Sequence, residues 1–113
     1  MLEAIRSAHI EPLQPPHWLA EVAAVVTRLD AALANKAIDL LDAMEFRVAH
    51  EPAIYKRASA LAARLDQHLF DTLYHAVALE HDASLITADR KYYNKARHLG
   101  QIVYLADWAL AGE

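Results

Sequence analysis

Residues 69–93 constrain the fold most, because a helical pattern in them is followed, after a short break, by an apolar run. Phe70, Leu73 and Val77 recur at helical spacing, which predicts a helix with one side turned inward. His-Asp-Ala at 81–83 ends that pattern, and Ser-Leu-Ile-Thr at 84–87 is typical of a buried strand. We therefore expect a helix and a strand that run antiparallel within one αβ unit.

Two carboxylates, Asp71 and Asp89, mark the ends of this unit. A helix over 71–81 rises about 16 Å and the strand returns by a similar distance, so both acids should lie together at the strand's carboxyl end. Neighbouring carboxylates repel each other unless a proton or a cation lies between them, and Mg²⁺ or Mn²⁺ is the usual oxygen-bound ion. The spacing alone also allows a simpler interpretation, in which Asp71 is a helix-start acid and Asp89 caps the next helix.

The remaining pattern predicts a single domain of 113 residues with a helix-rich α/β fold. Helices and short strands alternate along the chain, which favours a layered sandwich around a parallel sheet. The expected strands are residues 9–13, 46–50, 84–87 and 101–105, and the expected helices are residues 1–8, 16–29, 36–44, 52–67, 71–81, 90–99 and 106–110.

The composition excludes several classes of protein. The chain has no cysteine, so disulfides and thiolate metal sites are excluded. No apolar run reaches membrane-spanning length and no signal-peptide pattern is present, so we expect a soluble, cytoplasmic protein. The net charge is −4, which argues against binding nucleic acid through overall charge.

A local basic segment nevertheless follows Asp89: Arg90, Lys91, Lys95 and Arg97. These side chains suit backbone phosphates beside a metal site, although a solvated helix face would have the same composition. His75, one turn after Asp71, has two interpretations as well, as a ligand of the site or as a structural residue.

Three motifs resemble the PIN-domain family, and most closely its VapC-type toxins. LFDTLYHAVALEH is similar to the family's "DALYLALA" helix, TADRK to its "TAD" strand end, and QPPHWLAEVAAVVTRL to its "PPLLLVEVANALRR" segment. The resemblance implies a PIN-like three-layer sandwich in which Glu21, Asp71 and Asp89 are catalytic residues and ligands of Mg²⁺ or Mn²⁺. It also implies that Thr87 lies near the metal site, that the activity is hydrolysis of RNA, and that the partners are an antitoxin and a second copy of the chain.

The resemblance fails at the start of the chain. The family opens with a hydrophobic strand that ends in Asp and lies in the middle of the sheet, whereas this chain begins inside what looks like the following helix. The early acids Glu3 and Glu11 have neither that strand nor its spacing. We therefore expect one metal ligand and the central strand to be missing, with each buried unpaired backbone group costing about 1–3 kcal/mol. A truncated chain, a shift of residues 9–13 into the sheet, or a partner chain would each account for the gap.

The sequence as a whole predicts a metal-dependent endoribonuclease, the toxin of a toxin–antitoxin pair. Glu21, Asp71 and Asp89 would hold the metal, and Thr87, Arg90, Lys91 and Lys95 would bind RNA. The alternative is a non-catalytic PIN-like module for protein binding or dimerisation, which the missing strand favours. A small-molecule-binding protein ranks last, because the chain has no glycine-rich phosphate loop.

Overall fold

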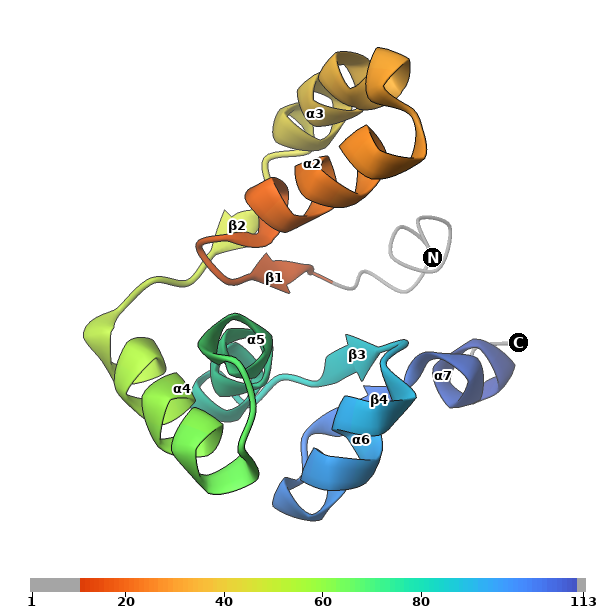
Figure 1. The fold of residues 1–113 in the computed structure, drawn as a ribbon. Coiled ribbons are helices and arrows are strands. Elements are labelled where there is room, and N and C mark those ends of the chain that lie inside the picture. Colours follow the sequence, from red (N-terminus) through yellow and green to blue (C-terminus); the bar gives the residue numbers. More distant parts are fainter. Residues whose placement is uncertain (1–10, 112–113) are drawn as a thin grey trace.

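A computed structural model of the chain describes residues 11–111. The structure is 66% helical and contains short parallel strands. The predicted α/β class is confirmed. Figure 1 shows the elements in chain order: β1 (Leu13–Gln14), α2 (Trp18–Leu29), a 3₁₀ turn (Ala31–Leu33), α3 (Ala34–Ala43), β2 (Arg47–Val48), α4 (Pro52–Leu65), α5 (Leu69–Glu80), β3 (Leu85–Thr87), α6 (Arg90–Ala96), a second 3₁₀ turn (Arg97–Leu99), β4 (Ile102–Tyr104) and α7 (Leu105–Ala111).

Most predicted elements are present, with boundaries that differ by a few residues. Between α2 and α3 the chain forms a 3₁₀ turn, in which the Asp30 carboxylate accepts a hydrogen bond from the backbone N–H of Ala32. The predicted helix over 90–99 divides into α6 and a 3₁₀ turn, which ends where Gly100 has a φ of +81°. The predicted helix over 1–8 and the first two residues of the predicted strand over 9–13 lie outside the described residues, and the strand β1 covers Leu13–Gln14 rather than residues 11–13.

The strands form two separate parallel pairs rather than one sheet. In the first pair, Leu13 of β1 is opposite Arg47 of β2. In the second, Leu85 of β3 is opposite Ile102 of β4. Within residues 11–111 no ladder joins β1 to β3, so the described sheet consists of two halves.

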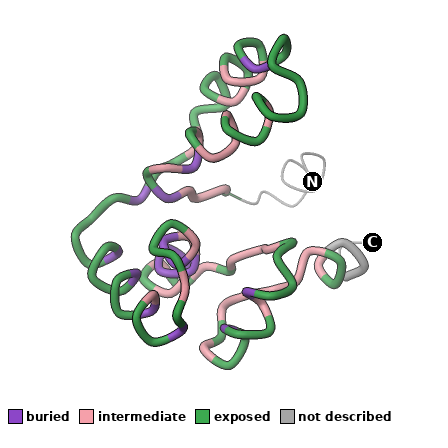
Figure 2. The backbone as a smooth tube through the Cα atoms, in the orientation of Figure 1, coloured by how far each residue is buried: buried purple, intermediate pink, exposed green. Residues whose placement is uncertain are grey.

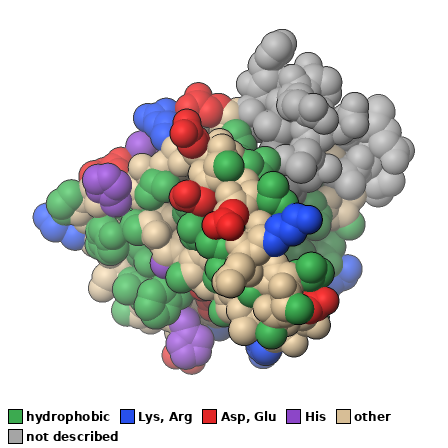
Figure 3. Space-filling view, turned by 90° about the horizontal axis from the view of Figure 1, so that it is seen from above, with side chains coloured by type: hydrophobic (Ala, Val, Ile, Leu, Met, Phe, Trp, Pro, Cys, Tyr) green, Lys and Arg blue, Asp and Glu red, His purple; other side chains and the backbone are tan. Residues whose placement is uncertain are grey.

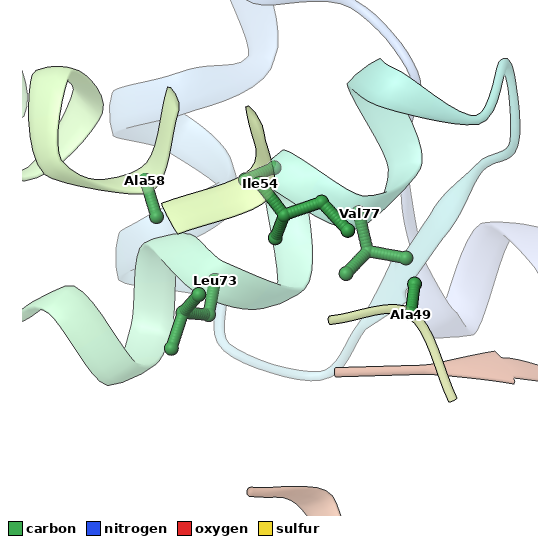
Figure 4. Close-up of a cluster of buried hydrophobic side chains, with 6 residues drawn as sticks. Ala49, Ile54, Ala58, Leu73 and Val77 are labelled. Carbon is green, nitrogen blue, oxygen red and sulfur yellow. The ribbon is translucent and has the colours of Figure 1, made fainter. Parts of the chain in front are cut away.

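Helix α5 occupies the centre of the molecule and packs against α4 (Figure 2). Their contact forms one hydrophobic cluster: Ala49, Ile54, Ala58, Leu73, Ala76 and Val77. Figure 4 labels all of these residues except Ala76. A second cluster joins α4 to α6 through Leu61, Leu65, Tyr92 and Ala96. Phe70, predicted to face inward, is instead 58% exposed and packs its ring 5.2 Å from that of His17.

Helices α2 and α3 form a hairpin that extends away from the other helices (Figure 1). Its buried residues are Trp18, which packs against Phe46, and Ala34. Several large apolar side chains of the hairpin stay in solvent, with Leu29 81% and Leu40 61% exposed. The hairpin therefore contributes little to the hydrophobic core.

Candidate active site

A cavity of about 240 Å³ opens at the carboxyl end of β3. Asp71 reaches it from the first turn of α5, and Asp89 from the residue just before α6. Thr87, Tyr74 and Tyr92 complete its polar lining. The two carboxylates that the helix and strand lengths predicted to be neighbours thus line the same cavity.

Asp89 is both a helix cap and a cavity residue. Its Oδ1 accepts a hydrogen bond of 3.0 Å from the backbone N–H of Tyr92, at the start of α6. Its own N–H donates to the hydroxyl oxygen of Thr87 at 3.0 Å, which fixes the loop between β3 and α6. Among the described residues Oδ2 has no hydrogen-bond partner, so this oxygen is available to a ligand.

Asp71 is held by a residue that the sequence analysis missed. Gln67 donates from Nε2 to Asp71 Oδ2 at 3.0 Å, and its own Oε1 accepts from Lys95 Nζ at 3.1 Å. Lys95 also donates to the carbonyl oxygen of Asp66 at 3.2 Å. Gln67 lies in the short connection between α4 and α5, and no helical spacing indicated this contact. Lys95 therefore acts on Asp71 through Gln67 in this structure, rather than by direct contact.

Glu21 lies next to this cavity but is not part of its lining. Its Oε2 accepts a hydrogen bond of 3.0 Å from the hydroxyl of Tyr74, which does line the cavity. Burial of the Tyr74 ring raises the pKa of its hydroxyl, and the hydrogen bond to Glu21 raises it further. Tyr74 consequently stays protonated at neutral pH and connects the third predicted acid to the other two.

The described residues offer a pair of carboxylates rather than a complete metal cluster. No three Asp, Glu, His or Cys side chains within residues 11–111 lie close enough together to hold an ion. Asp71 and Asp89 also form no salt bridge with Lys, Arg or His in that part of the chain. Their shared cavity is thus acidic, without a cationic side chain to neutralise it.

A family model described as "PIN domain" matches residues 2–98. The chain belongs to the PIN domain family. The family predicted from the three motifs is therefore confirmed, and with it a nuclease-like fold. A search of curated proteins and a search of solved structures each gave no significant match. None of the helices in residues 11–111 combines the length and the hydrophobicity that crossing a bilayer requires.

His75 of this PIN domain is a buried structural residue. It is fully buried, its Nε2 donates to the carbonyl oxygen of Gly100 at 2.8 Å, and its Nδ1 accepts from the hydroxyl of Tyr92 at 2.9 Å. Burial lowers the pKa of the imidazole, which keeps it neutral. Because both ring nitrogens are used, His75 has no nitrogen left for a ligand in the acidic cavity.

Two arginines of the basic segment of this PIN domain lie over tyrosine rings. The Arg90 guanidinium lies 4.9 Å from the centre of the Tyr104 ring, and the Arg97 guanidinium lies 5.4 Å from that of Tyr93. The two rings are 5.8 Å apart, so the four residues form an arginine–tyrosine row across α6, the 3₁₀ turn that follows it, and β4. Lys91 is exposed in the same helix, α6.

Figure 3, which views one face of the molecule, shows charges of both signs scattered among apolar side chains.

Proposed function

We propose that this PIN domain is a metal-dependent ribonuclease whose acidic cavity holds Mg²⁺ or Mn²⁺ through Asp71 and Asp89. The observation that carries the proposal is the shared cavity, in which two carboxylates lie without a cationic partner among the described residues. Each carboxylate has one oxygen in a hydrogen bond with a neutral donor and, within residues 11–111, one oxygen without such a bond.

These residues fit a hard divalent ion. Mg²⁺ usually keeps several waters and binds one or two carboxylates, which is what a partly open cavity with two acids offers. The bound ion would supply a water of lowered pKa and would stabilise negative charge on the phosphate. Glu21, oriented by the neutral hydroxyl of Tyr74, would accept hydrogen bonds from water on the α2 side of the cavity.

The RNA would lie along the outer surface of β3 and α6. Thr87 uses its oxygen to accept from Asp89, which leaves the hydroxyl proton to be donated to a phosphate. Arg90 and Lys91 are exposed immediately beyond Asp89 and would bind the backbone on either side. Lys95 would contribute mainly by fixing Gln67, to which it donates. We assign substrate binding to these four residues: Thr87, Arg90, Lys91 and Lys95.

We further propose that the protein is the cytoplasmic toxin of a toxin–antitoxin pair and acts as a homodimer. The support is the exposed apolar surface of the α2–α3 hairpin, in particular Leu29, Leu33 and Leu40. Large apolar side chains left in solvent on one part of a domain are frequent at protein–protein interfaces. A second copy or an antitoxin helix would cover them.

A second candidate function is that of a non-catalytic PIN-like module for protein binding. It is favoured by the lack of a three-ligand cluster within residues 11–111. A two-carboxylate site binds a divalent ion more weakly than a site with an additional acid, because each added carboxylate increases the favourable charge. The two functions differ in one measurable property, which is divalent-ion binding at the acidic cavity.

The decisive experiment compares the wild type with Asp71→Asn, Asp89→Asn and, as control, Asp42→Asn, which changes an exposed acid on α3. Cleavage of a single-stranded RNA in Mn²⁺ should fall on the order of 10²-fold in the two cavity variants and stay unchanged in the control. Free Mn²⁺ should be measured in parallel by electron paramagnetic resonance. Equal cleavage in all four proteins would reject the assigned site. Absence of both cleavage and Mn²⁺ binding in the wild type would favour the binding module.

A further inference from the structure

The arginine–tyrosine row lies directly beside the acidic cavity. Thr87, which lines that cavity, is the Cα partner of Tyr104 in the parallel pair of β3 and β4. Paired residues of neighbouring strands direct their side chains to the same face of a sheet, so Tyr104 extends that face beyond Thr87. Arg90, which covers the Tyr104 ring, follows Asp89 of the cavity immediately in the chain. The row therefore begins at the cavity and continues along α6 to Arg97 in the 3₁₀ turn.

The two arginines of the row are exposed and are not paired with an acid in residues 11–111. Arg47 and Arg57 form salt bridges with glutamates, whereas neither Arg90 nor Arg97 forms one within this part of the chain. Each guanidinium of the row instead lies over a tyrosine ring, at a distance typical of a cation–π contact. Because the ring covers one face of the planar guanidinium, the opposite face is the one that remains for a ligand.

Charge alone gives this surface little attraction for a nucleic-acid strand. The whole chain has a net charge of −4, so its overall field repels phosphates. Within the basic segment, Lys95 already donates to Gln67, which leaves Arg90, Lys91 and Arg97 for a strand. A strand therefore needs contacts in addition to those with phosphates. Unpaired bases provide them, because every base has a flat π-face that stacks on planar side chains.

We propose that the arginine–tyrosine row is a base-stacking site for a single strand, in which one unpaired base lies against the open face of Arg90 and another against that of Arg97. Guanidinium planes stack on unpaired bases as aromatic rings do, and the tyrosine behind each plane holds it in position. The N–H groups at the edge of Arg90 stay available for a backbone phosphate, because stacking uses only the face. A duplex is excluded from the site, since its bases already stack on one another.

Because the stacked strand is taken to be the substrate, this site rests on the proposed ribonuclease function. Stacking itself requires neither a metal ion nor cleavage. The row also has no group assigned to a 2′-hydroxyl, so single-stranded DNA should bind as well as RNA does. Binding of DNA in the absence of metal therefore tests the stacking site separately from the acidic cavity. The preference for bases should be the same in Asp71→Asn as in the wild type, whether or not the wild type cleaves RNA.

The test measures the affinity of the full chain for a single-stranded oligoadenine DNA of about ten nucleotides, a length typical of one single-strand binding module. EDTA removes divalent ions, and fluorescence anisotropy of a terminal dye reports binding. The matched control strand has the same length and phosphates, with abasic residues in place of the adenosines. The wild type should bind the adenine strand roughly tenfold or more tightly than the abasic strand, as expected when bases stack. The fluorescence of 2-aminopurine placed in the adenine strand should fall on binding, because stacking quenches it.

Arginine-to-lysine variants locate the stacking, because lysine keeps the charge and loses the plane. Arg97→Lys should reduce the preference for the adenine strand to less than about threefold and leave the affinity for the abasic strand unchanged. The control is Arg28→Lys, which changes an exposed arginine of α2 that lies over no aromatic ring in residues 11–111 and should keep the wild-type preference. Thermal unfolding verifies that each variant is folded, and Arg90→Lys provides the same test if Arg97→Lys is not.

Three results would overturn the proposal. They are equal affinity of the wild type for the adenine and abasic strands, an undiminished preference in the lysine variants of the row, and no binding of the adenine strand at millimolar concentration.

Discussion

The α2–α3 hairpin and the part of the chain from α4 to β4 differ sharply in how they are stabilised. Both hydrophobic clusters are built on α4, α5 and α6, with one residue, Ala49, contributed from just before α4. The hairpin buries Trp18 and Ala34 and leaves Leu29, Leu33 and Leu40 largely in solvent. The region from α4 to β4 is thus stabilised by its core, whereas the hairpin gains little from burial.

The acidic residues are distributed over both regions. Asp71 and Asp89 belong to the well-packed region, and Glu21 belongs to the hairpin. Two hydrogen bonds connect the regions beside the cavity: Tyr74 donates to Glu21, and His17 Nε2 donates to the carbonyl oxygen of Phe70 at 2.9 Å. The position of Glu21 relative to the two aspartates therefore depends on these hydrogen bonds, each worth about 1 kcal/mol, and on the packing of the His17 ring against the rings of Phe70 and Tyr74.

The largest expected effect comes from removing a core side chain. Leu73→Ala should lower the free energy of unfolding by about 2–5 kcal/mol, because Leu73 is buried between α4 and α5 and its loss leaves a cavity. Leu29→Ala is the matched control on the hairpin and should change the free energy of unfolding by less than about 0.5 kcal/mol. Urea titration followed by circular dichroism measures both. Similar losses in the two variants would contradict the difference in packing between the regions.

The same contrast explains what the sequence could and could not predict. Helical spacing and the run at 84–87 correctly predicted α5, β3 and the shared cavity of Asp71 and Asp89, because these depend on contacts between near neighbours in the chain. The interpretation in which Asp89 caps the next helix is confirmed, whereas metal binding by Asp71 and Asp89 stays a prediction.

Contacts between distant residues were not predictable in the same way. Glu21 and Tyr74 are 53 positions apart, and no local pattern specifies that they meet. Gln67 was missed because a single polar residue in a helix-ending turn has many structural explanations. Only the resemblance to the PIN family predicted a gap in the middle of the sheet, because hydrophobic periodicity identifies strands and not their order. In the described residues the sheet is divided into two halves.

A smaller effect is expected from cutting the connection between the regions. Tyr74→Phe removes the hydroxyl that donates to Glu21 and keeps the ring. It should lower the free energy of unfolding by about 1 kcal/mol. If the proposed nuclease activity holds, RNA cleavage should fall by about tenfold, as is typical when a residue supporting a ligand is lost.

The control for this variant is Tyr55→Phe, which removes a hydroxyl from an exposed tyrosine on α4. Tyr55→Phe should keep the Mn²⁺ affinity and the RNA cleavage rate of the wild type. An unchanged cleavage rate in Tyr74→Phe, together with the expected loss of stability, would assign a purely structural role to the Tyr74–Glu21 hydrogen bond.

The pH dependence of stability should originate in the packed region. Burial lowers the pKa of His75 from its usual 6.5, so below about that pH the unfolded chain binds a proton that the folded chain does not. The unfolded state therefore gains stability as the pH falls, and the free energy of unfolding decreases. His75→Gln cannot titrate, so its destabilisation relative to the wild type should be largest near pH 8 and should shrink toward pH 5. Urea titrations at several pH values measure this difference, and a constant difference would exclude His75 as the source.

The smallest change in stability is expected on the hairpin surface. Leu29→Ser alters a side chain that is 81% exposed, so the free energy of unfolding of a single chain should change by less than about 0.5 kcal/mol. If a second copy covers this surface, as proposed, the same substitution should weaken association, because Leu29 would lose its apolar contact in the dimer. Sedimentation velocity of the wild type and the variant at matched concentrations separates the two effects. Ala24→Ser, a milder change at an exposed alanine of the same helix, is the control. Identical sedimentation of wild type and Leu29→Ser would mean that the hairpin's exposed leucines take no part in self-association, and would leave an antitoxin as the partner to test on this surface.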